Sequence, residues 1–229
     1  MGTNMVKRVV GRSAWIVAWV GLVLAPIHAL SRFATEAGKS DLDSPVVRAW
    51  AEPAARQLRP LLSWSDAGTV YMNYGRIWLP LLLVGTVCAF VVRRERRPRG
   101  MERWGWWIAL TGYVATTLSV FGDYFTPWME QSFAFLGIPG ILTSVLGSTV
   151  LGIALLRRRF RPPATAWLLA AWLPLLYALS DVIALGAGLL PMLWAWGIAG
   201  RSMARAAGRA DAPVVLPGEA PPADIAGSR

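Results

Sequence analysis

The sequence predicts an all-α polytopic membrane protein, a six-span helix bundle with one longer extracytoplasmic segment that carries an amphipathic helix. Three observations predict this class. The 229 residues are 55% hydrophobic and 16% charged, whereas soluble domains carry about 25% charged residues. Apolar runs long enough to cross a bilayer, which takes about 20 residues, recur along the chain. The basic residues gather in alternate loops between these runs, as in proteins whose cytoplasmic loops are positively charged.

The predicted spans and the short loops between them form a membrane domain over residues 1–207. The spans cover residues 13–31, 77–94, 104–125, 133–156, 164–184 and 188–206. The apolar run from 164 to 207 is too long for one crossing and suits two, with a hinge at "LGAG" (185–188) and Pro191 near the start of the last helix. Five spans is the alternative, in which one of the last two helices only dips into the bilayer.

The first span raises the question of a signal peptide. Lys7, Arg8 and Arg12 precede its apolar run, and a secretory signal begins in the same way. The run is long and contains tryptophan, however, and "PIHALSRFA" makes a poor small-x-small cleavage site. We therefore predict an uncleaved first span.

Loop charges predict the orientation. Three basic residues precede the first span, six lie in 93–103, four in 157–161 and four at the C-terminal end (201, 205, 209 and 229), which places 17 of the 23 on one side. The 123–132 loop, "DYFTPWMEQS", has no basic residue. Since arginine and lysine concentrate on the cytoplasmic side, we predict cytoplasmic N- and C-termini. The run "VVRRERRPRG" (91–100) is then a topological anchor and not a nucleic-acid site; contact with anionic lipid headgroups is the alternative.

The longer extracytoplasmic segment covers residues 33–76. Ser44 is a candidate N-cap and Pro45 stands at the first helical position. Apolar residues follow at spacings of three and four, which places them on one helical face: Val47, Trp50, Ala54, Leu58 and Leu61. We interpret this pattern as an amphipathic helix lying in the membrane interface. The alternative is a loop cap packed on the bundle.

Residues 208–229 and the overall composition support two further predictions, a disordered tail and a bacterial source. The C-terminal stretch is rich in Pro, Ala and Gly and lacks aromatic residues, so we predict a disordered cytoplasmic tail. Nearly all basic residues are arginine. With the abundant Ala, Gly and Trp, that bias indicates a bacterial source and hence the cytoplasmic (inner) membrane.

Most enzyme signatures are missing. The chain has no Gly-rich phosphate loop, no "GxSxG" and no "HExxH". His28 is the only histidine and Cys88 the only cysteine, so neither a multi-histidine metal site nor a disulfide can form within one chain. No cofactor or metal is predicted, and Cys88 is interpreted as a small core residue.

Ionisable groups near the predicted outer ends of the spans are the candidate site residues, since such groups are costly near the bilayer. Asp123 and Asp181 are the candidate catalytic acids. The candidate binding residues are His28, Arg32, Arg76 and Glu130. One interpretation is that these residues pair with each other and orient the helix ends, with Asp181 bound to Arg76 or Arg32. The other is an outward-facing polar pocket below the 34–71 segment.

A small-residue stripe marks the fourth predicted span. Gly140, Ser144, Ser148 and Gly152 recur every four residues and permit close helix contact. We predict packing within the chain, with a dimer seam as the alternative. Gly137, Pro139 and Gly140 should kink or loosen this helix near its outer end.

Three function classes follow. The first is a non-enzymatic scaffold, subunit or accessory factor whose partners are membrane lipids and another membrane protein. The second is a membrane-embedded enzyme that acts on a lipophilic isoprenoid or lipid substrate by acid catalysis in an outward-facing, Trp-lined pocket. The third, a small-solute transporter or channel, lacks the ionisable groups at mid-membrane depth that such proteins use. A solid bundle favours the first class, and a deep pocket touching Asp123 or Asp181 favours the second.

Overall fold

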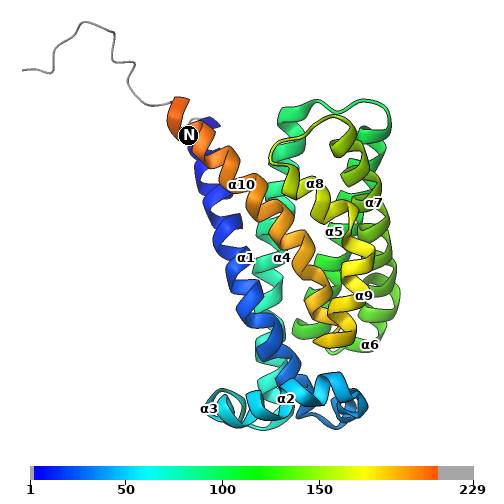
Figure 1. Cartoon of the computed structure of the whole chain (residues 1–229). Coiled ribbons are helices and arrows are strands. Elements are labelled where there is room, and N and C mark those ends of the chain that lie inside the picture. The colour runs from blue at the N-terminus through cyan, green and yellow to red at the C-terminus, as the bar shows by residue number, and fades with distance from the viewer. Residues whose placement is uncertain (1–2, 211–229) are drawn as a thin grey trace, which may run out of the picture.

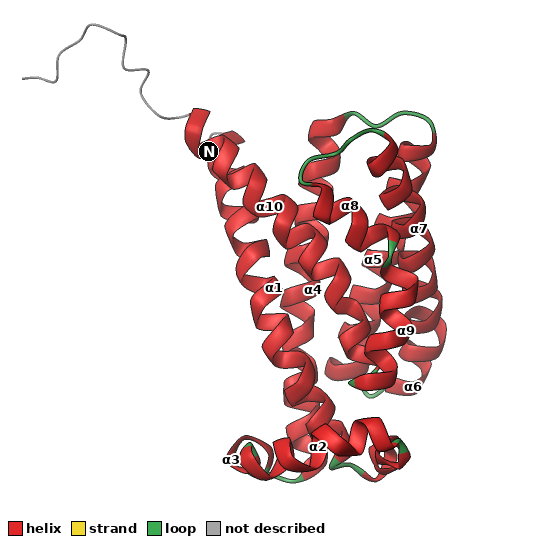
Figure 2. Ribbon diagram, viewed as in Figure 1, coloured by secondary structure: helices red, strands yellow, loops and turns green. Residues whose placement is uncertain are grey.

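The computed structural model describes residues 3–210, which form helices and, within that range, no strands (Figure 2). The long helices are α1 (Thr3–Phe33), α4 (Ala67–Arg96), α5 (Met101–Phe125), α7 (Ile138–Arg157) and α10 (Leu190–Ala210). Two helices form a bent pair, α8 (Pro163–Ala170) and α9 (Trp172–Val182). The shorter elements are η1 (Glu36–Asp43), α2 (Pro45–Gln57), α3 (Arg59–Leu62), α6 (Met129–Ser132), η2 (Phe133–Gly137) and η3 (Leu185–Leu189). The all-α prediction is confirmed.

Three of these helical stretches are long and apolar enough to cross a membrane. They are α1, α4 and the stretch Met129–Arg157, with mean hydropathies of 1.8, 2.0 and 1.8. The bent pair α8–α9 makes a fourth if it counts as one span. The other two long helices are not among these candidates; α5 carries several tryptophans and threonines, and α10 carries three arginines. The helices thus support a membrane protein with three or four candidate spans.

The helices run between two ends of the molecule (Figure 1). One end, called the basic end here, holds the start of α1, the last turns of α10 and the connections 97–100 and 158–162. At the opposite end, called the α2 end, lie α2 and α3. The basic loops singled out in the sequence therefore share one end of the fold.

A buried carboxylate connects the helix ends at the basic end. Glu102 is 1% exposed, and one of its oxygens accepts a hydrogen bond from Nε of Arg96 at 2.8 Å. Its other oxygen lies 3.3 Å from Nη1 of Arg158. Because Arg96 ends α4 and Arg158 follows α7, this one side chain joins both basic connections to the start of α5. Nothing in the sequence pattern had singled out Glu102.

Close backbone contacts hold the helices in pairs. In the α1–α10 pair, a side chain at Gly11 would collide with the carbonyl oxygen of Gly200. In the α5–α7 pair, Gly147 faces the backbone nitrogen of Ala109 so closely that an added Cβ would collide with it. Small residues permit this approach, and dispersion contacts between the helices replace the hydrophobic effect that lipid does not supply.

The small-residue stripe on α7 packs inside the chain. Ser144 and Ser148 are fully buried, and the Ser148 hydroxyl lies 2.6 Å from that of Tyr113 on α5. Gly140 faces α5, and Gly152 faces Ala170 on α8. The prediction of packing within the chain is confirmed. Cys88, likewise predicted to be a core residue, is fully buried beside the carbonyl of Trp196.

The predicted span 164–184 is not one straight helix. It breaks at Ala171 into α8 and α9, which are bent by 68°. Pro174 lies three residues after the break. A proline has no N–H to bond the carbonyl four residues earlier, and its ring clashes with that carbonyl. A proline in this position kinks or breaks a helix, which accounts for the bend.

The fourth predicted span is loosened at its start, as its glycines and proline predicted. Residues Phe133–Gly137 form a π-helical turn in which the N–H of Ile138 donates to the carbonyl of Phe133. Pro139 follows and cannot donate to the carbonyl of Phe135. Turns of this kind are frequent at functional sites.

The predicted amphipathic helix exists as α2, but its apolar face packs on the bundle. Val47 and Ala51 are buried in a cluster with Leu30 and Phe33 of α1. The indole N–H of Trp50 donates to the carbonyl oxygen of Val182 at 2.7 Å. The loop-cap alternative is therefore the one observed. The predicted tail 208–229 lies outside the described residues except for its first three, which continue α10.

We predict that Gly147→Ala destabilises the α5–α7 pair. The new methyl group meets backbone, which cannot rotate away, so unfolding should become easier by about 1–3 kcal/mol. Gly208→Ala is the matched control, because no atom lies near its added Cβ and alanine is the better helix former. Thermal unfolding in detergent should show a lower Tm for the first variant and an equal or higher Tm for the second. Equal behaviour of the two would contradict close backbone packing.

Candidate functional site

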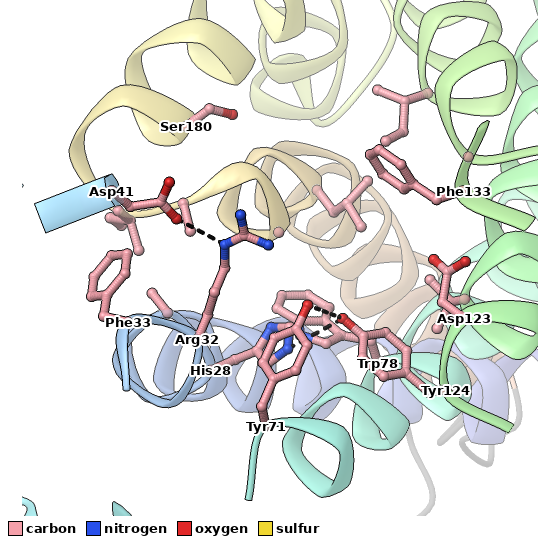
Figure 3. A pocket seen from close by; sticks show the side chains of 18 of the residues that line it. His28, Arg32, Phe33, Asp41, Tyr71, Trp78, Asp123, Tyr124, Phe133 and Ser180 are labelled. Atoms are coloured by element: carbon pink, nitrogen blue, oxygen red, sulfur yellow. Dashed lines mark hydrogen bonds and ion pairs between the residues drawn. The ribbon is translucent and has the colours of Figure 1, made fainter. Parts of the chain in front are cut away.

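A cavity of about 700 Å³ lies at the α2 end of the bundle (Figure 3). Its wall is contributed by the end of α1, the start of α4, the end of α5, the π-helical turn before α7, and the residues that link α9 to α10. The cap formed by η1 and α2 covers it through Ser40, Asp41 and Val47. The size lies within the range of about 300–1,000 Å³ found for small-molecule sites.

The cavity brings together five of the six candidate site residues. They are His28, Arg32, Asp123, Glu130 and Asp181. The sixth, Arg76, is exposed; its Nε donates to the carbonyl oxygen of Tyr124 at 3.0 Å, and its guanidinium lies 5.6 Å from the ring of Phe125. Arg76 therefore fastens the end of α5 from outside the cavity.

The expected pairing of Asp181 is wrong. Asp181 is exposed at the cavity rim, and within residues 3–210 it forms no ion pair with Arg32 or Arg76. Arg32 instead binds Asp41 of the cap, with 2.8 Å between Nε and Oδ2. The sequence pattern could not show this pair, because η1 folds back over the end of α1 only in the tertiary structure.

A hydrogen-bonded aromatic network surrounds His28. The indole N–H of Trp78 donates to Nδ1 of His28 at 3.0 Å, and Nε2 lies 3.3 Å from the Tyr124 hydroxyl. The Tyr71 hydroxyl lies 3.2 Å from that of Tyr124, and the Tyr71 ring stacks on the imidazole at 4.9 Å. The imidazole is thus held on both nitrogens and on one face.

This network determines the charge of the ring. Tryptophan can only donate a hydrogen bond, so Nδ1 of His28 must offer a lone pair to Trp78. The imidazole is therefore neutral and carries its hydrogen on Nε2, which can donate to Tyr124. His28 is a neutral wall residue whose nitrogens are both occupied, and not a free base.

Asp123 is a buried polar group of the cavity wall with hydrogen-bonding capacity left for a ligand. Its side chain is 9% exposed, and the Ser119 hydroxyl donates to Oδ2 at 3.2 Å. Oδ1 has no hydrogen-bond partner. Figure 3 shows the carboxyl group among the side chains around the cavity. A buried carboxyl oxygen without a partner is costly, and a bound water, ion or ligand that donates a hydrogen bond would remove that cost.

Several site residues were missed at the level of sequence. Tyr71 and Trp78 are seven apart on α4, which places them on one helical face, and that spacing was the available signal. Asp41, Tyr124, Phe33 and Phe133 carried no pattern that points to a site. The predicted tryptophan lining is instead a mixed aromatic one, since Trp78 is the one tryptophan among the cavity's described lining residues.

Comparison with protein-family models, curated proteins and solved structures found no match. Within residues 3–210, no three His, Cys, Asp or Glu side chains are placed to hold a metal ion.

We predict that Trp78 and His28 are energetically coupled. Trp78→Phe leaves Nδ1 of His28 buried without a donor, which should cost about 1–3 kcal/mol in unfolding free energy. In a His28→Leu background the indole N–H is the unpaired group, so the same substitution should recover stability. Thermal unfolding of both single variants and the double variant measures the coupling, with the exposed Trp167→Phe as the control. Additive losses would contradict the hydrogen bond.

Proposed function

We propose that this chain is a six-span integral membrane protein that binds an amphiphilic small molecule in the cavity at its α2 end. The observation that carries the proposal is the cavity, which has ligand-site dimensions and gathers five of the six candidate residues. Its wall is largely apolar, with a few convergent polar groups, as is typical of sites for lipophilic ligands.

Contacts at the two ends support six crossings. The bent pair begins just after the 158–162 connection, where Arg158 approaches Glu102, and ends where Val182 accepts the hydrogen bond from Trp50. It therefore connects opposite ends, which favours a broken span over a re-entrant loop. The helices α5 and α10 lie beside α7 and α1 over the same length and need less apolar surface because neighbours cover it.

The charge distribution supports an orientation. The basic connections and the start of α1 share one end, and basic loops face the cytoplasm in membrane proteins. We infer that the basic end is cytoplasmic, in the inner membrane of a bacterium, and that the cavity opens near the outer leaflet. Arg93 and Arg201 stack on Trp107 and Trp15 at 4.3 and 4.4 Å, an arrangement suited to a lipid headgroup region.

Binding agrees with an accessory role, in which the protein holds a lipid-like molecule for a partner. Acid catalysis on an isoprenoid or lipid is the second candidate, and the unpartnered oxygen of Asp123 favours it. A protonated carboxyl in an aromatic cavity can start carbocation chemistry, because the rings stabilise the cation. A bound molecule recovered chemically unchanged after incubation with the protein would favour the binding role.

We predict that labelling of single cysteines, introduced in a Cys88→Ala background, follows the six-span topology. Gln131→Cys should react with an impermeant maleimide in intact cells, whereas Met101→Cys and Gly208→Cys should react only after lysis. The three positions report the loop after α5, the start of α5 and the last turn of α10. Five spans would make Gly208→Cys react from outside, and that result would overturn the six-span arrangement.

We predict that a long-chain alcohol with a mid-chain diazirine photolabels the cavity in nanodiscs. Peptide mass spectrometry should locate adducts on Val120, Phe133 and Ile141, which line the cavity. Ala184→Trp fills the cavity and should reduce these adducts about five-fold or more, corresponding to a loss of roughly 1 kcal/mol or more in binding free energy.

Ala178→Trp is the matched control, because Ala178 is exposed on α9 and is not among the lining residues. Its adducts should resemble those of the unmodified protein. Labelling confined to lipid-facing residues such as Leu142 and Leu146 would overturn the proposed function.

A further inference from the structure

The cavity wall is acidic although the chain is strongly basic. The lining contains four carboxyl groups and one guanidinium, from Asp41, Asp123, Glu130, Asp181 and Arg32 respectively, in a chain of net charge +10. Arg32 is already bound to Asp41 at 2.8 Å. The remaining three carboxyl groups have no ion-pair partner in the part of the chain that the structure describes.

The other ionisable lining group adds no positive charge. His28 accepts a hydrogen bond from Trp78 at Nδ1, and the ring is therefore neutral. An anionic ligand would meet one guanidinium that is already paired with Asp41, and three carboxyl groups without an ion-pair partner. A cationic ligand would compensate them.

The most buried of these carboxyl groups also has one oxygen without a hydrogen-bond donor. Asp123 is about nine-tenths buried, and its Oδ1 has no partner, whereas Oδ2 accepts from Ser119. The Ser180 hydroxyl, elsewhere on the wall, is likewise unpaired. A ligand that carries N–H hydrogens would supply the donor that Oδ1 of Asp123 lacks. Charge and hydrogen-bond capacity thus point to the same kind of headgroup.

The aromatic residues independently indicate a cationic headgroup. Rings from four elements surround the cavity: Phe33, Tyr71, Trp78, Tyr124 and Phe133. Aromatic faces attract ammonium groups, most strongly where water is excluded. The rest of the wall, including Val120, Ile141 and Leu189, is aliphatic and suits a hydrocarbon chain.

We propose that the ligand is an amphiphile with a primary ammonium headgroup, which binds Asp123 within the aromatic wall while Glu130 and Asp181 attract it at the rim. This inference rests on the proposed function, because it assigns a chemical class to the molecule in that cavity. The primary ammonium group can belong to a single-chain amine or to the ethanolamine headgroup of a phospholipid.

Competition against the diazirine alcohol tests the inference in phosphatidylcholine nanodiscs. Dodecylamine, dodecanol and dodecanoate have the same chain and differ in the charge of the headgroup. At equal mole fraction in the bilayer, dodecylamine should displace the probe at about one-tenth of the dodecanol concentration or less, and dodecanoate should be the weakest. Equal competition by amine and alcohol, or a preference for the acid, would overturn the inference.

Two variants assign the headgroup contact. Asp123→Asn should remove the advantage of dodecylamine over dodecanol while dodecanol still competes, which also shows that the variant is folded. Asp43→Asn is the control, since Asp43 is exposed and lies outside the cavity lining. An unchanged preference for the amine in Asp123→Asn would contradict the assignment.

A further experiment distinguishes a single-chain amine from an ethanolamine phospholipid. Phosphatidylethanolamine in place of part of the phosphatidylcholine should lower probe labelling if the headgroup belongs to a phospholipid. Unchanged labelling, together with strong competition by dodecylamine, assigns the site to a single-chain amine. Failure of the probe to label the cavity at all would instead overturn the proposed function.

Discussion

The architecture depends on two helix pairs whose backbones touch. Glycine at positions 11 and 200 lets α1 and α10 meet, and glycine at 147 lets α5 meet α7. In a bilayer such contacts have to come from shape, because lipid is as apolar as leucine. Each pair is closely packed, and the remaining helices join the pairs to each other. The space that separates them at the α2 end is the cavity.

The two ends of the bundle are closed by different chemistry. At the basic end, Glu102 forms ion pairs with both Arg96 and Arg158, so one buried carboxylate compensates positive charges from both basic connections. Losing that carboxylate would leave the arginines without a common partner. At the α2 end, closure comes from the cap, through the Trp50 hydrogen bond to Val182 and the Arg32–Asp41 ion pair. Arg32 and Asp41 line the cavity, and Val182 lies between the lining residues Asp181 and Ile183, so the cap closes part of the cavity wall.

On one side of the cavity the polar groups bond to each other, and on the other side a polar atom has no hydrogen-bond partner. Trp78, His28, Tyr124 and Tyr71 bond to each other and form a stable wall on the α1 and α4 side. Across the cavity, Asp123 keeps an oxygen without a partner beside the π-helical turn of residues Phe133–Gly137. A bundle that served only for packing would gain stability from an apolar residue at position 123. The arrangement is explained if a ligand supplies the missing donor.

Much of the fold follows from the sequence alone. Apolar runs predicted where each long helix lies, and alternating basic loops predicted which helix ends share a side, because hydropathy and charge are local properties. The cost of ionisable groups near a membrane also selected five residues that line the cavity. Their partners were decided only by tertiary structure. Arg32 binds Asp41 and not Asp181 because η1 folds over the end of α1. Trp78 reaches His28 because α4 lies against α1, fifty residues away along the chain. Periodicity specifies which face of a helix a residue occupies, whereas the order and tilt of the helices specify what that face meets.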